Sequence, residues 1–358
     1  MKILLYGGSF NPVHKAHVEN VRLALDAIAF DKVIIIPNKV GHFKENIEMA
    51  NDKDRITMLE IAFKDIEEDI EISNIEIEAN EKMYTTHLVD EIKKEYKDSQ
   101  LYFLIGSDQA MLLDKWYDIE NLKQKVNFIV TKREDDYIEE DLFIIDNIAL
   151  PDSSTSIRKD YQSTGIDSVD KYIRNHGLYL QEYVYTHLSK ARAQHTIRVA
   201  KLAKKLALHY SIDETKAYIA AMLHDIAKEL PLEEQFKLVG DCSDLFEASN
   251  PTIHQYSACN YIKEVMSIND DEVESAICKH TTGNFEMSKL DKIIYCADML
   301  EENRTFKDID KLRSLLYIDI DECFKQCFIK SYDFLVSKGI YIDSKLKKLK
   351  EKVERNEV

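Results

Sequence analysis

The pattern of apolar and polar positions divides the chain into two halves of different character. In residues 1–182, short apolar runs of strand length alternate with stretches whose apolar residues recur at helical spacing. The pattern predicts a helix at Val18–Phe30 and strands at Ile3–Tyr6, Val33–Ile36, Leu101–Ile105 and Asn127–Thr131. Because strands and helices alternate along this half of the chain, we predict an α/β domain with a parallel sheet and helices on both faces.

The second half shows helical periodicity alone. From about Tyr185 onward the strand signals stop, and the 3.6-residue period of a helix takes over. The clearest helical stretches are Val199–Tyr210, Glu214–Leu230, Gln255–Met266 and Asp271–His280. We therefore predict two domains, an α/β domain over residues 1–182 and an all-α domain over residues 186–350.

Composition supports a folded, water-soluble chain. Its 358 residues are 45% hydrophobic, with only 9 Gly and 5 Pro, so a core can form and turn-rich folds are disfavoured. The longest uncharged apolar run is strand-sized, and the N-terminus lacks the layout of a secretory signal. We expect a cytoplasmic protein with no membrane partner, in which the six cysteines are reduced thiols.

Net charge limits the partners. The chain carries −17 overall, of which residues 1–182, with 22 basic and 36 acidic side chains, contribute −14. Such acidity opposes binding to nucleic acid, so an anionic ligand must be held by a few local basic groups. The sequence excludes nucleic acid as a partner and is compatible with a homo-oligomer.

A phosphate-binding turn is predicted at the N-terminus. The first strand runs into Gly7-Gly8-Ser9-Phe10, and a helix begins near His14 and His17. Glycines let backbone N–H groups approach a ligand closely, and a helix start carries a partial positive charge. Two histidines three residues apart face the same way and can donate hydrogen bonds to a polyphosphate.

This turn and four later motifs resemble the class I nucleotidyltransferases, in the form of bacterial nicotinate-nucleotide adenylyltransferases. GGSFNPVHKAH resembles the family's phosphate-binding signature, and His42-Phe43-Lys44 resembles its His-Lys loop. The later motifs are Gly106-Ser107-Asp108 with Trp116, Ser153–Arg158 and Val169–Tyr179. The resemblance covers residues 1–180 and implies a Rossmann-like fold that transfers AMP from ATP to nicotinate mononucleotide.

The resemblance also implies roles for individual residues. The catalytic set is His14, His17, Lys44 and Arg158, which would bind the phosphates, and Mg²⁺ would arrive with ATP. The substrate-binding set is Gly7, Gly8, Ser9, Phe10, Tyr84, Thr85, Gly106, Asp108, Trp116, Ser154 and Thr155. The sequence departs from the family at Ala16, Met83 and His87, and the last two bear on the choice between nicotinate and nicotinamide. Another nucleotidyltransferase, for phosphopantetheine or nicotinamide mononucleotide, is the alternative.

A metal centre is predicted in the helical half. His195, His224-Asp225, His254, His280 and Asp298 lie on five predicted helices, each within an otherwise apolar stripe. Four histidines and two aspartates would be costly to bury without partners, whereas histidine and carboxylate together suit a transition metal.

These motifs resemble the HD-domain phosphohydrolases, and among them the diadenosine tetraphosphate hydrolases. HTIRVAKLA, AMLHDIAKELP, TIHQYSA, KHTTG and ADMLEENR occur in the order found there. The resemblance implies two iron ions and symmetric cleavage of diadenosine tetraphosphate to two ADP. It implies metal ligation by His195, His224, Asp225, His254, His280 and Asp298, with Asp225 bridging.

Two basic residues of the second half are candidates for binding substrate phosphates, and two alternative functions remain for this half. Lys228 as a catalytic group and Arg304 as a binding group would neutralise substrate phosphates, although either could be a surface charge. A hydrolase of guanosine tetraphosphate is the alternative substrate class, but that class has acidic residues where Lys228 stands. A module without catalytic activity is the third reading, and the completeness of both motif sets opposes it.

Overall fold

The computed structural model describes residues 1–39, 49–81, 83–132, 142–146, 153–240, 252–342 and 344–358. The contacts between Cα atoms divide the chain into two compact units, Met1–Ile173 and Arg174–Val358. The division falls inside helix α8 (Asp167–His176), nearer the N-terminus than the junction expected from the loss of strand signals.

The first unit is a six-stranded, all-parallel sheet with the order β3-β2-β1-β4-β5-β6. The strands are β1 (Lys2–Gly8), β2 (Lys32–Pro37), β3 (Ile70–Ile72), β4 (Gln100–Gly106), β5 (Val126–Lys132) and β6 (Phe143–Asp146). Four of them confirm the predicted strands. The two edge strands, β3 and β6, are additional, and neither has the long apolar run that marks a strand buried on both faces.

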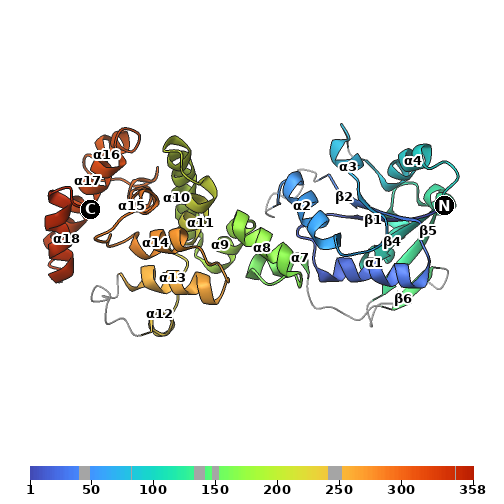
Figure 1. Cartoon of the computed structure of the whole chain (residues 1–358), viewed down its shortest axis with the longest axis horizontal. Coiled ribbons are helices and arrows are strands. Elements are labelled where there is room, and N and C mark those ends of the chain that lie inside the picture. Colours follow the sequence, from blue (N-terminus) through green and yellow to red (C-terminus); the bar gives the residue numbers. More distant parts are fainter. Residues whose placement is uncertain (40–48, 82, 133–141, 147–152, 241–251, 343) are drawn as a thin grey trace. The chain divides into compact units, whose positions relative to one another are not determined.

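Helices cover both faces of this sheet, as predicted (Figure 1). The helices in this part of the chain are α1 (Lys15–Ala27), α2 (Asp52–Phe63), α3 (Ile75–Glu78), α4 (Thr85–Glu95), α5 (Ser107–Ala110), a short 3₁₀ helix (Leu113–Lys115), α6 (Ile119–Lys125), α7 (Ser154–Asp160) and α8, the last two of which lie away from the sheet. Ile3 and Leu5 of β1 pack with Leu88 of α4 and Leu122 of α6 in one apolar core. The alternate residues of β1 point to the opposite face.

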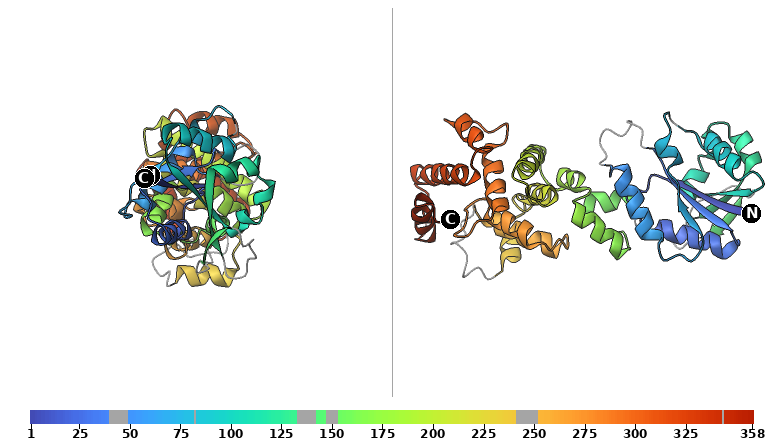
Figure 2. Two further views of the ribbon diagram at one scale, coloured as in Figure 1. Left: turned by 90° about the vertical axis from the view of Figure 1, so that its right-hand side faces the viewer. Right: turned by 45° about the horizontal axis from the view of Figure 1, so that its top comes forward.

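The second unit consists of helices in the part of the chain that is described, which confirms the all-α prediction (Figure 2). They are α9 (Leu180–His187), α10 (Lys190–His209), α11 (Glu214–Leu223), α12 (Leu232–Val239), α13 (Ile253–Glu264), α14 (Asp271–Lys279), α15 (Lys289–Leu300), α16 (Ile309–Leu315), α17 (Ile320–Ser337) and α18 (Ser344–Glu354).

Polar caps set where several of these helices begin. The side chains of Ser189, Asp213, Asp270, Ser288 and Asp319 accept hydrogen bonds from backbone N–H groups in the first turn that follows each. The helix predicted over 214–230 is shorter than expected, because α11 ends at Leu223 and the next residues form turns.

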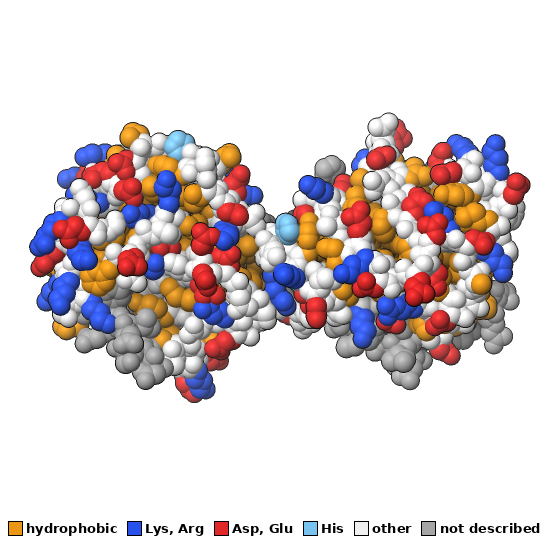
Figure 3. All heavy atoms as spheres, viewed as in Figure 1, with side chains coloured by type: hydrophobic (Ala, Val, Ile, Leu, Met, Phe, Trp, Pro, Cys, Tyr) orange, Lys and Arg blue, Asp and Glu red, His pale blue; other side chains and the backbone are white. Residues whose placement is uncertain are grey.

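The visible surface carries charges of both signs. On the face shown in Figure 3, acidic and basic side chains are intermixed over both units. None of the helices among the described residues combines the length and the apolar character that a membrane crossing requires.

Candidate active sites

A cleft of about 490 Å³ lies in the first unit where β1 and β4 end. These two neighbouring strands flank the point where the strand order reverses, and ligands of open α/β sheets bind at such a point. The turn after β1 lines the cleft with Gly7, Gly8 and Ser9. A side chain at position 8 would have a Cβ only 3.0 Å from the Phe10 ring, so glycine keeps this wall close to the backbone.

His14 and His17 form the start of α1 and line the same cleft. The backbone N–H of His14, the N-cap residue, donates to His17 Nδ1 at 3.1 Å. Because Nδ1 accepts, a neutral His17 carries its proton on Nε2 and can donate it to a ligand. Burial and the neighbouring His14 ring lower the pKa of His17 well below its usual value, which keeps the ring neutral.

The structure brings most of the predicted substrate-binding residues together. Those that line the cleft are Gly7, Gly8, Ser9, Thr85, Gly106, Asp108, Trp116 and Ser154, besides the two histidines. The Ser154 hydroxyl donates to the Pro12 carbonyl at 3.0 Å, which ties α7 to the β1 turn.

Four other predicted residues do not line the cleft. Arg158 is buried, and its guanidinium donates to the Asn11 carbonyl at 2.6 Å and to the Ser154 carbonyl at 3.1 Å. Phe10 is buried under the turn, and the Tyr84 ring stacks on Tyr117 with a centroid distance of 4.5 Å. Thr155 is exposed at the start of α7, while predicted Lys44 lies outside the described residues.

The cleft also contains polar residues that the sequence analysis did not single out, namely Asn20, Asn38, Glu76, Gln109 and Thr131. Burial raises the pKa of Glu76 to about 7, against the opposing effects of a backbone hydrogen bond from Lys39 and the charge of Arg55. Only Thr131, at the carboxyl end of the predicted strand Asn127–Thr131, carried a sequence signal for this position.

In the second unit, the six predicted metal ligands converge in one buried centre. His195 lies on α10, His254 on α13 and Asp298 on α15. His224-Asp225 follows the end of α11 rather than lying within a helix, and His280 caps the C-terminus of α14. Their ligand atoms form overlapping groups, within each of which all atoms lie within 4.8 Å of one another.

Asp225 connects the two sides of this centre. Its Oδ1 lies 3.3 Å from His254 Nε2 and 3.5 Å from His280 Nε2, while its Oδ2 lies 3.5 Å from His224 Nε2. One group contains Asp225 with His254 and His280, and another contains Asp225 with His195 and His224. The carboxylate therefore belongs to two potential cation sites at once.

Backbone and carboxylate acceptors orient the imidazoles. His224 Nδ1 lies 2.6 Å from the Ala221 carbonyl, and His280 Nδ1 lies 2.7 Å from the Ile277 carbonyl. These contacts place a proton on each Nδ1 and leave a lone pair on each Nε2, as metal-binding histidines require. The buried Nε2 of His224 has no hydrogen-bond partner. This orphaned ring nitrogen, facing a carboxylate, fits a cation.

The charges of the centre favour ligation. Although burial raises the pKa of a carboxyl group, the neighbouring histidines hold the pKa values of Asp225 and Asp298 below their usual range. Burial lowers the pKa of His254 to about 4. Burial also lowers the pKa of His224, but the Asp225 and Asp298 charges outweigh it, so that the net shift is upward. The ionised carboxylates and the neutral His254 imidazole are the forms that bind metal, and His224 would give up its second ring proton when a cation binds its Nε2.

Basic side chains surround the carboxylates. Lys228 Nζ lies 3.1 Å from Asp225 Oδ1, and an arginine not singled out in the sequence, Arg192, donates to Asp225 Oδ2 at 2.8 Å. Arg304 contacts Asp298 Oδ1 at 2.9 Å. These three cations offset the negative charge of the two carboxylates.

A cavity of about 510 Å³ adjoins the centre, and its wall includes His280, Asp298 and Arg304. Its remaining lining is mostly apolar and aromatic, with Tyr295, Phe306, Phe328, Tyr332 and Phe334, together with Lys330. It has room for an aromatic ligand that reaches the centre with an anionic group.

Glu301, a second residue not singled out in the sequence, positions His195. Its buried carboxylate lies 3.2 Å from His195 Nδ1 and accepts from Arg198 Nε at 2.7 Å. We expect Glu301→Gln to weaken metal binding by about 10–100-fold, because the neutral amide holds the imidazole less firmly. Retained metal is measured during dialysis against increasing chelator. Exposed Glu302 is the matched control, and an equal loss in Glu302→Gln would contradict this role.

Comparison with known proteins finds a matching family for each half of the chain. Residues 5–160 match the cytidylyltransferase-like family, and residues 192–313 match the HD domain family. A Mycoplasma pneumoniae protein described as a probable nicotinate-nucleotide adenylyltransferase/Ap4A hydrolase is 33% identical over 312 residues, or 85% of this chain and 90% of that protein. A Mycoplasma genitalium protein of the same description is 33% identical over 85% of this chain and 88% of its own length.

One solved structure resembles the second half. It is a predicted HD superfamily hydrolase involved in NAD metabolism from Clostridium acetobutylicum, 31% identical, with a TM-score of 0.45. The match covers 49% of this chain and 95% of that one.

Proposed function

Since the chain belongs to the family of the nicotinate-nucleotide adenylyltransferase/Ap4A hydrolases, we propose that it catalyses two reactions in two domains. Residues 1–182 transfer AMP from ATP to nicotinate mononucleotide, which gives deamido-NAD and pyrophosphate. Residues 186–350 hydrolyse diadenosine tetraphosphate symmetrically to two ADP. The chain acts on these small nucleotides in the cytoplasm.

The first reaction is an in-line attack by the mononucleotide phosphate on the α-phosphorus of ATP. It requires positioning and neutralisation of charge rather than a covalent intermediate. The β1 turn offers backbone N–H groups at Gly7 and Gly8, and His17 offers its Nε2–H to the triphosphate. Mg²⁺ bound to ATP supplies further neutralisation when present.

The observation that carries the transferase proposal is that the β1 turn and Trp116 face one cleft at the switch point of the sheet. The turn suits a triphosphate, and an indole suits stacking on a pyridine ring. The described lining contains neither Lys nor Arg, and its acidic members are Glu76 and Asp108. The phosphates would therefore be held by the two histidines, backbone N–H groups, Mg²⁺ and the predicted Lys44. Arg158, which donates to the Asn11 and Ser154 carbonyls, would position the β1 turn and α7.

The second reaction rests on the buried centre. His195, His224 and Asp298 would hold one cation, His254 and His280 the other, and Asp225 both. Two such ions, when bound, activate water and neutralise the attacked phosphate. The mixed set of imidazoles and carboxylates suits iron, manganese, cobalt or nickel, and we assign iron by resemblance. Lys228 and Arg304 bind the remaining phosphates.

The adjoining cavity supports a dinucleotide substrate. Its aromatic wall, which includes Phe306 and Phe334, can stack on an adenine, while Arg304 and Lys330 can pair with phosphate. For this second site, hydrolysis of guanosine tetraphosphate is the alternative to hydrolysis of diadenosine tetraphosphate.

A substrate panel on the purified full chain tests these proposals. Nicotinate and nicotinamide mononucleotides are each supplied with ATP, and diadenosine tetraphosphate and guanosine tetraphosphate are each supplied alone. Metal content is measured on the same sample. Product formation from nicotinate mononucleotide and two ADP per diadenosine tetraphosphate are expected. A chain that hydrolyses only guanosine tetraphosphate would contradict the second assignment.

Nicotinate mononucleotide should be preferred over the amide. Because the described lining of the cleft lacks Lys and Arg, we expect backbone N–H groups to recognise the substrate carboxylate. One charge-assisted hydrogen bond corresponds to a preference of at least about tenfold in kcat/KM. Initial rates over a range of each mononucleotide at saturating ATP measure it, and equal kcat/KM values would refute the preference.

A further inference from the structure

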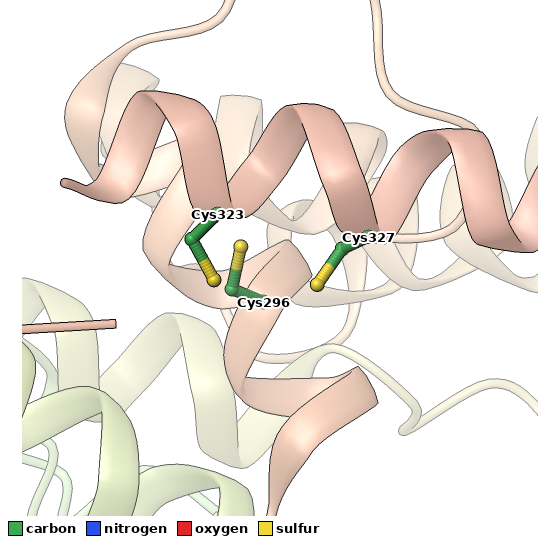
Figure 4. A group of neighbouring side chains, drawn as sticks. All are labelled: Cys296, Cys323 and Cys327. Carbon is green, nitrogen blue, oxygen red and sulfur yellow. The ribbon is translucent and has the colours of Figure 1, made fainter. Parts of the chain in front are cut away.

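Three cysteine side chains converge in the core of the second unit (Figure 4). Cys296 belongs to α15, and Cys323 and Cys327 lie four residues apart on one face of α17. All three have no exposed surface, and their Sγ atoms lie within 4.8 Å of one another. The four-residue spacing on α17 brings Cys323 and Cys327 together, and the packing of α15 against α17 adds Cys296.

The three sulfur atoms can surround one ion. With no side of their triangle longer than 4.8 Å, a point exists within about 2.8 Å of every sulfur, close to the length of a metal–thiolate bond of about 2.3 Å. Among the described residues, no further His, Cys, Asp or Glu joins this group. Tetrahedral Zn²⁺, which takes four ligands, therefore fits poorly, whereas a soft ion with three sulfur ligands fits.

The net charge of the occupied site distinguishes among the soft ions that could bind it. Three thiolates bring three negative charges into a core that is closed to water, and a buried net charge is costly. A univalent ion would leave two negative charges and a divalent ion one, while a trivalent ion leaves none. We propose that Cys296, Cys323 and Cys327 form a binding site for a trivalent, thiophilic metalloid ion, of which trivalent arsenic is the simplest.

The binding reaction is an exchange of ligands on arsenic and needs neither an oxidant nor a reductant. Arsenous acid carries three hydroxyl groups on arsenic, and each S–H proton leaves with one hydroxyl as water while an As–S bond forms. Three As–O and three S–H bonds break, and neither the oxidation state nor the net charge changes. Since the sulfurs have no exposed surface, arsenous acid must enter through a local separation of α17 from α15. We therefore expect binding to be slow.

Native mass spectrometry of the metal-loaded full chain with arsenite tests the site. We expect an adduct of one arsenic atom less three hydrogen atoms. A two-thiol site would instead retain a hydroxyl on arsenic and lose only two hydrogens. The wild-type chain giving only that hydroxyl-bearing adduct, or none after prolonged incubation, would overturn the proposal.

Matched variants locate the bound arsenic. Cys323→Ser and Cys327→Ala should each abolish the three-thiol adduct, and thermal unfolding identifies whichever variant remains folded. Cys259 and Cys278 form a second pair of neighbouring thiols, so the double variant Cys259→Ser/Cys278→Ser is the control and should keep the adduct. A three-thiol adduct that survives in folded Cys323→Ser or is lost in that control would show that arsenic binds elsewhere.

Discussion

Replacing Asp225 with alanine is expected to remove both metal ions and to lower diadenosine tetraphosphate hydrolysis by at least about a thousandfold. Oδ1 of Asp225 faces His254 and His280, and its Oδ2 lies 3.5 Å from His224 Nε2. Truncation thus takes a donor from each cation site and leaves two cations close together with less counter-charge. Elemental analysis of the purified variant measures the metal before any kinetics.

Lys228→Ala is the matched control for this variant. Lys228 contacts Asp225 Oδ1 at 3.1 Å, but an ammonium group cannot ligate a cation. Its loss should weaken hydrolysis and leave the metal content unchanged. A full metal complement in Asp225→Ala, or metal loss in Lys228→Ala, would contradict the shared role of Asp225. One ion retained in Asp225→Ala would favour a mononuclear centre in which His254 and His280 contact substrate.

Asp225→Asn separates a loss of charge from a loss of fold. The amide keeps the size of the side chain in this fully buried position, while it removes the negative charge and replaces one acceptor oxygen with an NH₂ donor. We expect this variant to lose metal as well, because the amide cannot compensate two cations. Adenylyl transfer by the same preparations reports whether the first unit remains intact.

Much of the fold could be predicted because a strand that is buried on both faces has an uninterrupted apolar sequence. The strand Val33–Ile36 is buried on both faces and is apolar throughout, so its pattern is unambiguous. Ile70–Ile72 is only three residues long, contains Glu71 and pairs along one edge, so it resembles a loop. The end of α11 could not be predicted either, since the first Gly or Pro after Leu223 is Pro231.

Some residues of the two sites could also be predicted from the sequence, and others could not. His224 and Asp225 stand out in sequence because they are polar residues in an apolar stripe, where burial without a partner is costly. Arg192 and Glu301 carry as much of the geometry, yet charged residues near helix ends usually face water, and only the folded chain shows what they contact. Glu76 gave no signal, because its place in the cleft depends on how a four-residue helix packs.

Replacing His17 is expected to abolish adenylyl transfer, with a fall of at least about a thousandfold in kcat, and to leave hydrolysis nearly unchanged. His17 lines the cleft of the first unit, and its Nε2–H is available to the triphosphate as charge develops in the transition state. The hydrolase residues all lie in the second unit. Both activities are measured on one preparation of His17→Ala, and loss of both in a folded variant would contradict two independent sites.

His17 also has a structural role that must be separated from catalysis. Its Nδ1 accepts the His14 backbone N–H, so alanine also removes a cap from α1, a loss that costs about 1 kcal/mol in comparable helices. His17→Gln is the matched variant, because a glutamine at this third helical position can accept the same N–H while lacking the imidazole. We expect His17→Gln to unfold near the wild-type temperature and still to lack adenylyl transfer. If His17→Gln recovered most of the wild-type kcat, His17 would be a capping residue alone, and the hydrogen bonds that stabilise the charge on the triphosphate would have to come from His14 and the backbone of the β1 turn.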